Sequence, residues 1–82
     1  MNVKVTFFGP LSELIEIEET DNLELVLPSG ISYADALDRV VGRWPALSSF
    51  TITLAGDGVF LKHDNPIPDI RELSVFPPFA GG

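Results

Sequence analysis

The sequence contains no cysteine, and this absence excludes several kinds of chemistry. Without a thiol the chain has no disulfide framework, no zinc–thiolate site and no nucleophilic or redox-active sulfur of its own. Its single histidine, His63, has no second histidine or cysteine with which to complete a metal site, so we expect neither a bound metal nor a bound cofactor. A chain free of cysteine suits a reducing compartment, and we expect a cytoplasmic protein.

Basic residues are also scarce, because five lysines and arginines stand against twelve aspartates and glutamates, giving a net charge of −7. So few positive charges cannot neutralise phosphates, which argues against nucleic acid as a partner. No apolar run approaches the roughly 18 residues of a membrane helix, and the first residues lack a signal-peptide pattern, so no membrane association is expected. The acidity fits simple solubility, or a partner whose docking surface is basic.

The 82 residues are enough for one domain, which we place at residues 1–76 with an extended tail at 77–82. The main helix is predicted at residues 32–44, with Ser32 as N-cap, Asp35 in the capping-box position and Pro45 ending it. A shorter helix is predicted to begin at Pro10 and run to Ile15, followed by an acidic turn at 16–21.

Five segments alternate between apolar and polar residues with the period of two that is typical of half-buried strands. They lie near residues 3–8, 23–27, 51–54, 59–62 and 73–76, with a turn expected at 55–58. The order of strands and helices predicts an α+β fold of the β-grasp, or ubiquitin-like, kind. We therefore expect a mixed sheet of four or five strands with one main helix on one face.

The same alternation places one phenylalanine on the polar side of each of three strands, at Phe8, Phe60 and Phe76. Val59 and Leu61 are expected to face the core on either side of Phe60. If the three strands are neighbours, the three rings form an exposed apolar patch and a candidate partner-binding site. The alternative is that the loop after the fourth strand covers them.

The last six residues form a distinct C-terminal segment with the sequence Pro77-Pro78-Phe79-Ala80-Gly81-Gly82. Two prolines favour extended geometry and would project the last four residues away from the domain. Gly81 and Gly82 have no side chains to pack, but they can pass through a narrow channel and present a carboxylate to another protein. The alternative is an ordinary frayed terminus.

Two stretches carry a resemblance to a known family. They are Phe7-Phe8 followed by Leu11-Ser12-Glu13-Leu14, and the last eight residues from Val75 to Gly82, with Phe-Pro-Pro ahead of Gly-Gly. These residues resemble the MoaD/ThiS family of sulfur carriers, in particular its MoaD branch, the small subunit of molybdopterin synthase. The resemblance covers the whole chain in length and element order.

The resemblance implies that the chain acts as a co-substrate, with Gly82 as the reacting residue. An E1-like adenylating enzyme would use ATP to activate the Gly82 carboxylate, and a sulfur donor protein would convert it to a thiocarboxylate. The tail would then enter the large subunit of molybdopterin synthase and give its sulfur to cyclic pyranopterin monophosphate. In molybdenum cofactor biosynthesis the catalytic residues would belong to that large subunit, in a heterotetramer of two small subunits flanking a large-subunit dimer. Phe8, Phe60 and Phe76 match positions that the family uses to dock its partners.

Three alternatives stay open. The chain could carry sulfur for thiamine thiazole or another pathway, although the Phe-Pro-Pro element favours the molybdopterin branch. It could be a ubiquitin-like modifier attached through Gly82 to lysines of other proteins. It could also be a plain binding module whose tail is never activated. The two glycines alone do not distinguish a carrier from a modifier.

Overall fold

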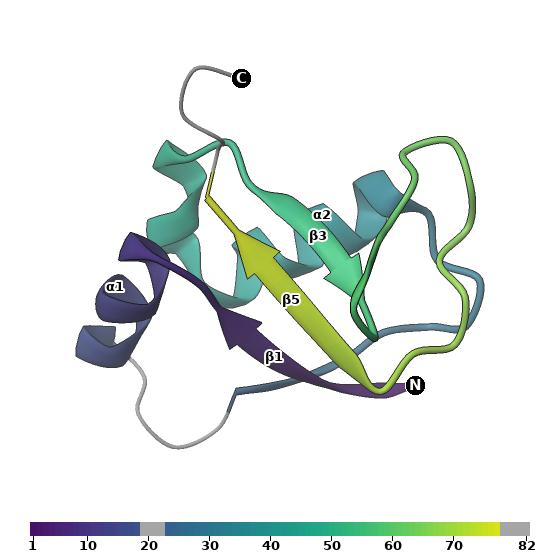
Figure 1. The fold of residues 1–82 in the computed structure, drawn as a ribbon, viewed down its shortest axis with the longest axis horizontal. Coiled ribbons are helices and arrows are strands. Elements are labelled where there is room, and N and C mark those ends of the chain that lie inside the picture. Colours follow the sequence, from purple (N-terminus) through teal and green to yellow (C-terminus); the bar gives the residue numbers. More distant parts are fainter. Residues whose placement is uncertain (19–22, 78–82) are drawn as a thin grey trace.

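The computed structural model describes residues 1–18 and 23–77, which form a five-stranded sheet and two α-helices (Figure 1). The fold is a β-grasp with α2 as its main helix, as predicted from the sequence. Along the chain the elements are β1 (Asn2–Phe7), α1 (Pro10–Glu18), β2 (Glu24–Val26), α2 (Tyr33–Arg43), the 3-10 helix η1 (Pro45–Ser49), β3 (Thr53–Gly56), β4 (Val59–Phe60) and β5 (Glu72–Phe76).

The first and last strands lie side by side at the centre of the sheet, whose order is β2-β1-β5-β3-β4 (Figure 1). β1 and β5 are parallel, and the other neighbouring pairs are antiparallel. Because β1 and β5 run in the same direction, their carboxyl ends meet at one end of the sheet. The turn from β1 into α1 and the residues after β5 therefore leave the sheet at the same place.

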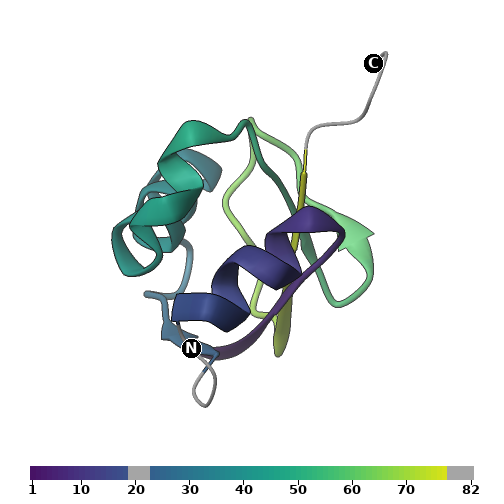
Figure 2. The ribbon, with the colours of Figure 1, turned by 90° about the vertical axis from the view of Figure 1, so that its left-hand side faces the viewer.

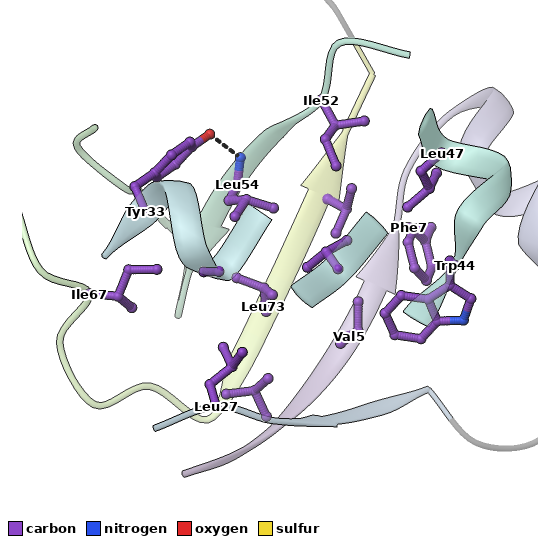
Figure 3. Close-up of a cluster of buried hydrophobic side chains, with 14 of the residues drawn as sticks. Val5, Phe7, Leu27, Tyr33, Trp44, Leu47, Ile52, Leu54, Ile67 and Leu73 are labelled. Carbon is purple, nitrogen blue, oxygen red and sulfur yellow. Dashed lines mark hydrogen bonds between the residues drawn. The ribbon is translucent and has the colours of Figure 1, made fainter. Parts of the chain in front are cut away.

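The core lies between the sheet and the helices, which cover the same face of the sheet (Figure 2). Alternate strand residues point into it, as the period-two pattern predicted. Phe7 meets the buried Trp44 edge to face, with ring centroids 4.9 Å apart (Figure 3). The largest fully buried side chains among the described residues are apolar: Trp44, Leu11, Leu27, Leu47, Leu54, Leu73, Val3, Val5, Val40 and Val75.

Helix α2 begins and ends where its sequence signals place it. The Ser32 hydroxyl oxygen accepts a hydrogen bond from the Asp35 backbone N–H at 3.1 Å, which satisfies one of the free donors of the first turn. At the other end the Trp44 N–H still donates to the Val40 carbonyl, and Pro45 then begins η1. Tyr33, Ala36 and Val40 form the buried stripe of this helix.

The hydroxyl of Tyr33 connects α2 to the sheet. It accepts a hydrogen bond from the buried Leu54 backbone N–H at 3.1 Å (Figure 3). The Leu54 carbonyl accepts from the Leu61 N–H, just beyond the two-residue strand β4. The Tyr33 side chain of α2 thus accepts the hydrogen bond of a β3 backbone N–H at a position beyond the end of β4.

Two sequence predictions of turn position are wrong. Helix α1 continues to Glu18, through residues expected to form an acidic turn, because residues 16–18 include no glycine or proline that would end it. Strand β3 continues through Ala55 and Gly56, which were expected in a turn. An Asp-Gly pair needs only two residues to reverse a hairpin, so the residue before it stays in the strand.

The prediction that Val59 faces the core is also wrong, since this side chain is 68% exposed. Val59 pairs with Gly56 across the hairpin, and Gly56 offers no side chain to pack against. β4 is also an edge strand of the sheet, and both of its two residues are exposed. Leu61 is half-buried against the core, in agreement with its predicted direction.

Candidate functional site

The face of the sheet opposite the helices carries the candidate docking surface (Figure 2). The strand register defines its members, because residues paired across neighbouring strands share a face. Thr6 pairs with Ser74, Ser74 with Ala55, and Ala55 with Phe60. The open face therefore contains Lys4, Thr6, Phe8, Glu72, Ser74, Phe76, Thr53, Ala55 and Phe60.

Phe8 and Phe76 stack on this face, with ring centroids 4.5 Å apart and ring planes 9° apart. Phe8 follows β1 directly, and its N–H donates to the Val75 carbonyl at 3.1 Å, so the parallel pairing of β1 and β5 continues past the end of β1. Phe8 is 40% exposed and Phe76 is half-buried. The stacked pair lies at the end of the sheet where β5 ends.

Phe60 joins the pair from β4, with its ring centroid 5.4 Å from that of Phe76. The predicted patch required the three strands to be neighbours, whereas β3 lies between β4 and β5. The rings meet across β3 because its residue opposite Phe60 is the small Ala55, which is itself 3% exposed. Phe60 remains 55% exposed, so the aromatic triad of Phe8, Phe60 and Phe76 offers a continuous apolar surface to a partner.

Hydrogen bonds that were not predicted from the sequence hold the hairpin that carries Phe60. Asp57 and Gly58 both have positive φ angles, 47° and 85°, as a two-residue type I′ hairpin turn requires. One carboxylate oxygen of Asp57, Oδ1, accepts from the Arg71 N–H at 3.0 Å and from the Glu72 N–H at 2.9 Å. The Asp-Gly pair signalled a turn, but nothing in the sequence indicated that its carboxylate holds the start of β5.

Pro77 is the last described residue, and it lies half-buried against the turn that follows β1. A Cβ built on Gly9 would lie 3.4 Å from Cγ of Pro77, so the proline ring is in contact range of the glycine backbone. The other predicted tail residues, Pro78, Phe79, Ala80, Gly81 and Gly82, lie outside the described residues. The role assigned to Gly82 stays a prediction.

The chain was compared with models of known protein families. The ThiS family model matches residues 5–82, which is nearly the whole chain. The chain belongs to the ThiS family. Members of this ThiS/MoaD-like family are small ubiquitin-like sulfur carriers that work with E1-like activating enzymes and partner proteins. This confirms the resemblance stated from the sequence at the level of the family.

A solved structure shows the same fold. The crystal structure of SAMP1 from Haloferax volcanii is similar to this ThiS-family chain with a TM-score of 0.69 and 25% sequence identity. The alignment covers 100% of each chain, which supports the β-grasp assignment for the whole length. No curated protein matches the chain significantly.

Other candidate sites in this ThiS-family protein are weaker. Among the described residues, no group of three or more histidine, aspartate or glutamate side chains is placed to hold a metal ion. His63 is exposed and stacks on Tyr33, with ring centroids 4.2 Å apart, so it packs on the helix side of the molecule. Within residues 1–18 and 23–77, no helix is long and apolar enough to cross a membrane.

Proposed function

We propose that this protein is the sulfur-carrying small subunit of molybdopterin synthase. The observation that carries the proposal is the aromatic triad, which lies on the open face at the end of the sheet where the C-terminal segment begins. A partner that binds the triad would have the segment after Pro77 beside its own surface. The Phe-Pro-Pro and Gly-Gly elements of that segment favour the molybdopterin branch of the ThiS family.

The proposed reaction needs no catalytic side chain from this chain. An oxygen of the Gly82 carboxylate attacks the α-phosphorus of ATP, pyrophosphate leaves, and an acyl adenylate forms. Hydrosulfide then attacks the carbonyl carbon and AMP leaves, which gives the thiocarboxylate. In the synthase the thiocarboxylate sulfur would attack a carbon of the pterin precursor and displace an oxygen substituent of that carbon as the leaving group. Water would then cleave the acyl–sulfur bond to return the carboxylate. A dithiolene contains two sulfur atoms, so two loaded chains would react in turn. Adenylation matters because a free carboxylate is a poor electrophile.

The triad would provide the apolar centre of the interface with the large subunit and with the E1-like enzyme. Large aromatic side chains at the centre of an interface commonly carry most of the binding free energy. The net charge of −7 would favour partners whose docking surfaces are basic and would raise the rate of encounter. ATP would be bound by the activating enzyme, not by this chain.

A ubiquitin-like modifier joined through Gly82 to lysines is the second candidate. The β-grasp fold and the likeness to SAMP1 agree with either function, so fold alone does not separate them. Both functions begin with adenylation of Gly82. They differ in the nucleophile that attacks next, which is sulfur for the carrier and a lysine amine for the modifier.

Intact-mass spectrometry of the full chain tests the proposal. The protein would be incubated with ATP, an E1-like activating enzyme and sulfide, alone and with candidate target proteins. A gain equal to the mass difference between sulfur and oxygen supports a carrier. Covalent adducts with other proteins would instead support a modifier, and an unchanged mass under all conditions would refute both.

Two variants at the terminus make the test specific to Gly82. Deleting Gly82, or adding one residue after it, should abolish sulfur loading while changing the free energy of unfolding by less than about 0.5 kcal/mol. Loading of either variant would contradict the mechanism. To identify the pathway, the loaded protein would be mixed with a molybdopterin synthase large subunit and cyclic pyranopterin monophosphate. Formation of the dithiolene supports the molybdopterin branch, and its absence, with transfer to a thiazole synthase instead, would refute it.

A further inference from the structure

Three stretches of the sequence carry no charged residue, although 21% of the residues in the chain are charged. They are residues 5–12, 44–56 and 73–77. The first begins in β1 and ends in α1, the second runs from the C-cap of α2 through η1 and β3, and the third contains the end of β5. The net charge of −7 therefore comes entirely from the rest of the chain.

The fold brings the three stretches together at one end of the sheet. β1 and β5 are parallel, so both strands end there. β3 runs antiparallel to β5 and starts there, with Thr53 opposite Phe76. In both ribbon views the connection from η1 to β3 lies at the end of β5 (Figure 1, Figure 2). The charged pair of Lys4 and Glu72 lies at the opposite end. The three stretches thus form an uncharged end of the molecule, at the place where the C-terminal segment begins.

Phe50 is an exposed aromatic residue of the uncharged end that does not belong to the aromatic triad. It follows η1 directly, its N–H donates to the Leu47 carbonyl at 3.0 Å, and its side chain is 41% exposed. Its backbone is extended, with a φ angle of −120° and a ψ angle of 149°, and Ile52 two residues later points into the core. Because residues two apart in an extended chain share a side, Phe50 lies on the side of the sheet that carries the helices. Phe8 and Phe76 lie on the open side.

We propose that the partner which receives the C-terminal segment holds the uncharged end in an uncharged, apolar cleft. Phe50 would be its anchor on the helix side, and the triad its anchor on the open side. The inference rests on the proposed function, because it takes the occupant to be the protein that acts on Gly82. It also extends that function, since the triad alone requires a partner that covers only one face of the sheet.

The lack of charge is the argument for a cleft of this chemistry. Moving a charged side chain out of water is costly unless an opposite charge meets it. The centres of protein interfaces are accordingly poor in charged residues and rich in aromatic ones. An end with exposed phenylalanines on both sides of the sheet, built from uncharged stretches, is suited to such burial. The net charge of −7 would act over distance on the rate of encounter, with basic groups of the partner around the cleft and not inside it.

The first test measures the affinity of Phe50→Ala for a molybdopterin synthase large subunit and for an E1-like activating enzyme. Val26→Ala is the control, because Val26 is 65% exposed and pairs with Asn2 at the opposite end of the sheet. Calorimetry should show a Kd raised about 10-fold or more for Phe50→Ala. The Kd of Val26→Ala should stay within about 2-fold of the wild type. Equal affinities of folded Phe50→Ala and wild type would overturn the proposal.

Charges of either sign at Thr51 test the chemistry of the cleft. Thr51 is exposed next to Phe50, so both Thr51→Glu and Thr51→Lys should fold. Both should raise the Kd about 5-fold or more, because either charge would lose its water in an uncharged cleft. Tighter binding of one Thr51 variant would mean that the cleft carries the opposite charge, and the proposal would be wrong.

Ala34→Glu and Ala34→Lys control for the change in net charge. Ala34 is exposed in the first turn of α2, at the other end of that helix from η1. At about 0.15 M salt, where charges more than about 8 Å apart are largely screened, both variants should bind within about 2-fold of the wild type. Losses as large as those at Thr51 would show that net charge, and not burial in a cleft, sets the affinity.

Formation of the dithiolene by the sulfur-loaded protein separates this inference from the proposed function. The expected affinities without dithiolene formation would support the cleft and refute the molybdopterin function. Dithiolene formation with an unchanged affinity of Phe50→Ala would support the function and overturn the cleft. Sedimentation of the protein alone tests for a second copy as the occupant, and a dimer that Phe50→Ala dissociates would overturn the proposal. A wild type that binds neither partner would refute both.

Discussion

Phe8 and Phe76 stack nearly parallel, with ring centroids 4.5 Å apart, and add a side-chain contact to the backbone pairing of the first and last strands. Such a stack contributes about 1 kcal/mol beyond the burial of its area. Apolar surface remains exposed on Phe8 and on Phe60, whose ring lies beside that of Phe76. A small protein with net charge −7 has ample polar surface, and a contiguous aromatic cluster is best explained by a partner that covers it.

Replacing Phe60 with alanine should weaken partner binding without unfolding the protein. Phe60 is 55% exposed, so its removal should cost the fold about 1 kcal/mol or less. If the triad is the centre of the interface, binding to the large subunit or to the activating enzyme should lose about 2 kcal/mol. Titration calorimetry would measure the binding, and urea denaturation the stability.

Val59→Ala is the control for this experiment. Val59 is the adjacent residue of β4, is 68% exposed and lies on the opposite face of that strand. Its removal should leave binding within about 0.5 kcal/mol of the wild type. Equal losses of affinity for both variants would mean that the partner contacts the edge of the sheet and not the triad.

Tyr33→Phe should destabilise the protein although it removes a single oxygen atom. The Leu54 N–H would lose its hydrogen-bond acceptor in a position that is fully buried. Leaving a buried donor without a partner costs about 1–3 kcal/mol. Hydrogen exchange of the Leu54 amide should accelerate more than the global loss of stability explains, and unchanged exchange there would contradict this account.

Alanine at two glycines should change stability in opposite directions. A Cβ on Gly56 would lie 2.9 Å from two carbon atoms of Ile70, so Gly56→Ala should cost about 1–3 kcal/mol through overpacking. Gly42 lies in α2, with no atom within 4 Å of such a Cβ, and Gly42→Ala should stabilise by about 1 kcal/mol. Thermal unfolding of both variants measures this, and a destabilised Gly42→Ala would contradict the helix-propensity argument.

Features that depend on neighbouring residues in the chain could be predicted from the sequence. The Ser32 cap of α2 follows from local rules, and so does the outward direction of Phe8 and Phe76. The contact of Tyr33 with Leu54 could not be predicted, because it joins residues 21 positions apart through the path of the fold. Val59 was misplaced because alternation assumes a partner side chain across the strand, and Gly56 supplies none. The register that sets Gly9 beside Pro77 likewise appears only when β1 and β5 are paired.

Asp57 offers a prediction in which backbone strain and hydrogen bonding can be separated. Its Oδ1 accepts two backbone N–H groups at the start of β5, and its φ angle is +47°. Asp57→Gly removes the acceptor but suits the backbone, so it should cost about 1–2 kcal/mol. Asp57→Ala removes the acceptor and strains the turn, which should cost about 1 kcal/mol more.

Asp57→Asn keeps an acceptor oxygen and tolerates a positive φ angle, so it should lose less than about 1 kcal/mol. Urea denaturation of the three variants should therefore rank them Asn, Gly and Ala in decreasing stability. Amide exchange at Arg71 and Glu72 should accelerate in the Gly variant and much less in the Asn variant. If Asp57→Gly is as stable as the wild type, the carboxylate does not hold β5, and the position of Phe60 beside Phe76 depends on the turn backbone alone.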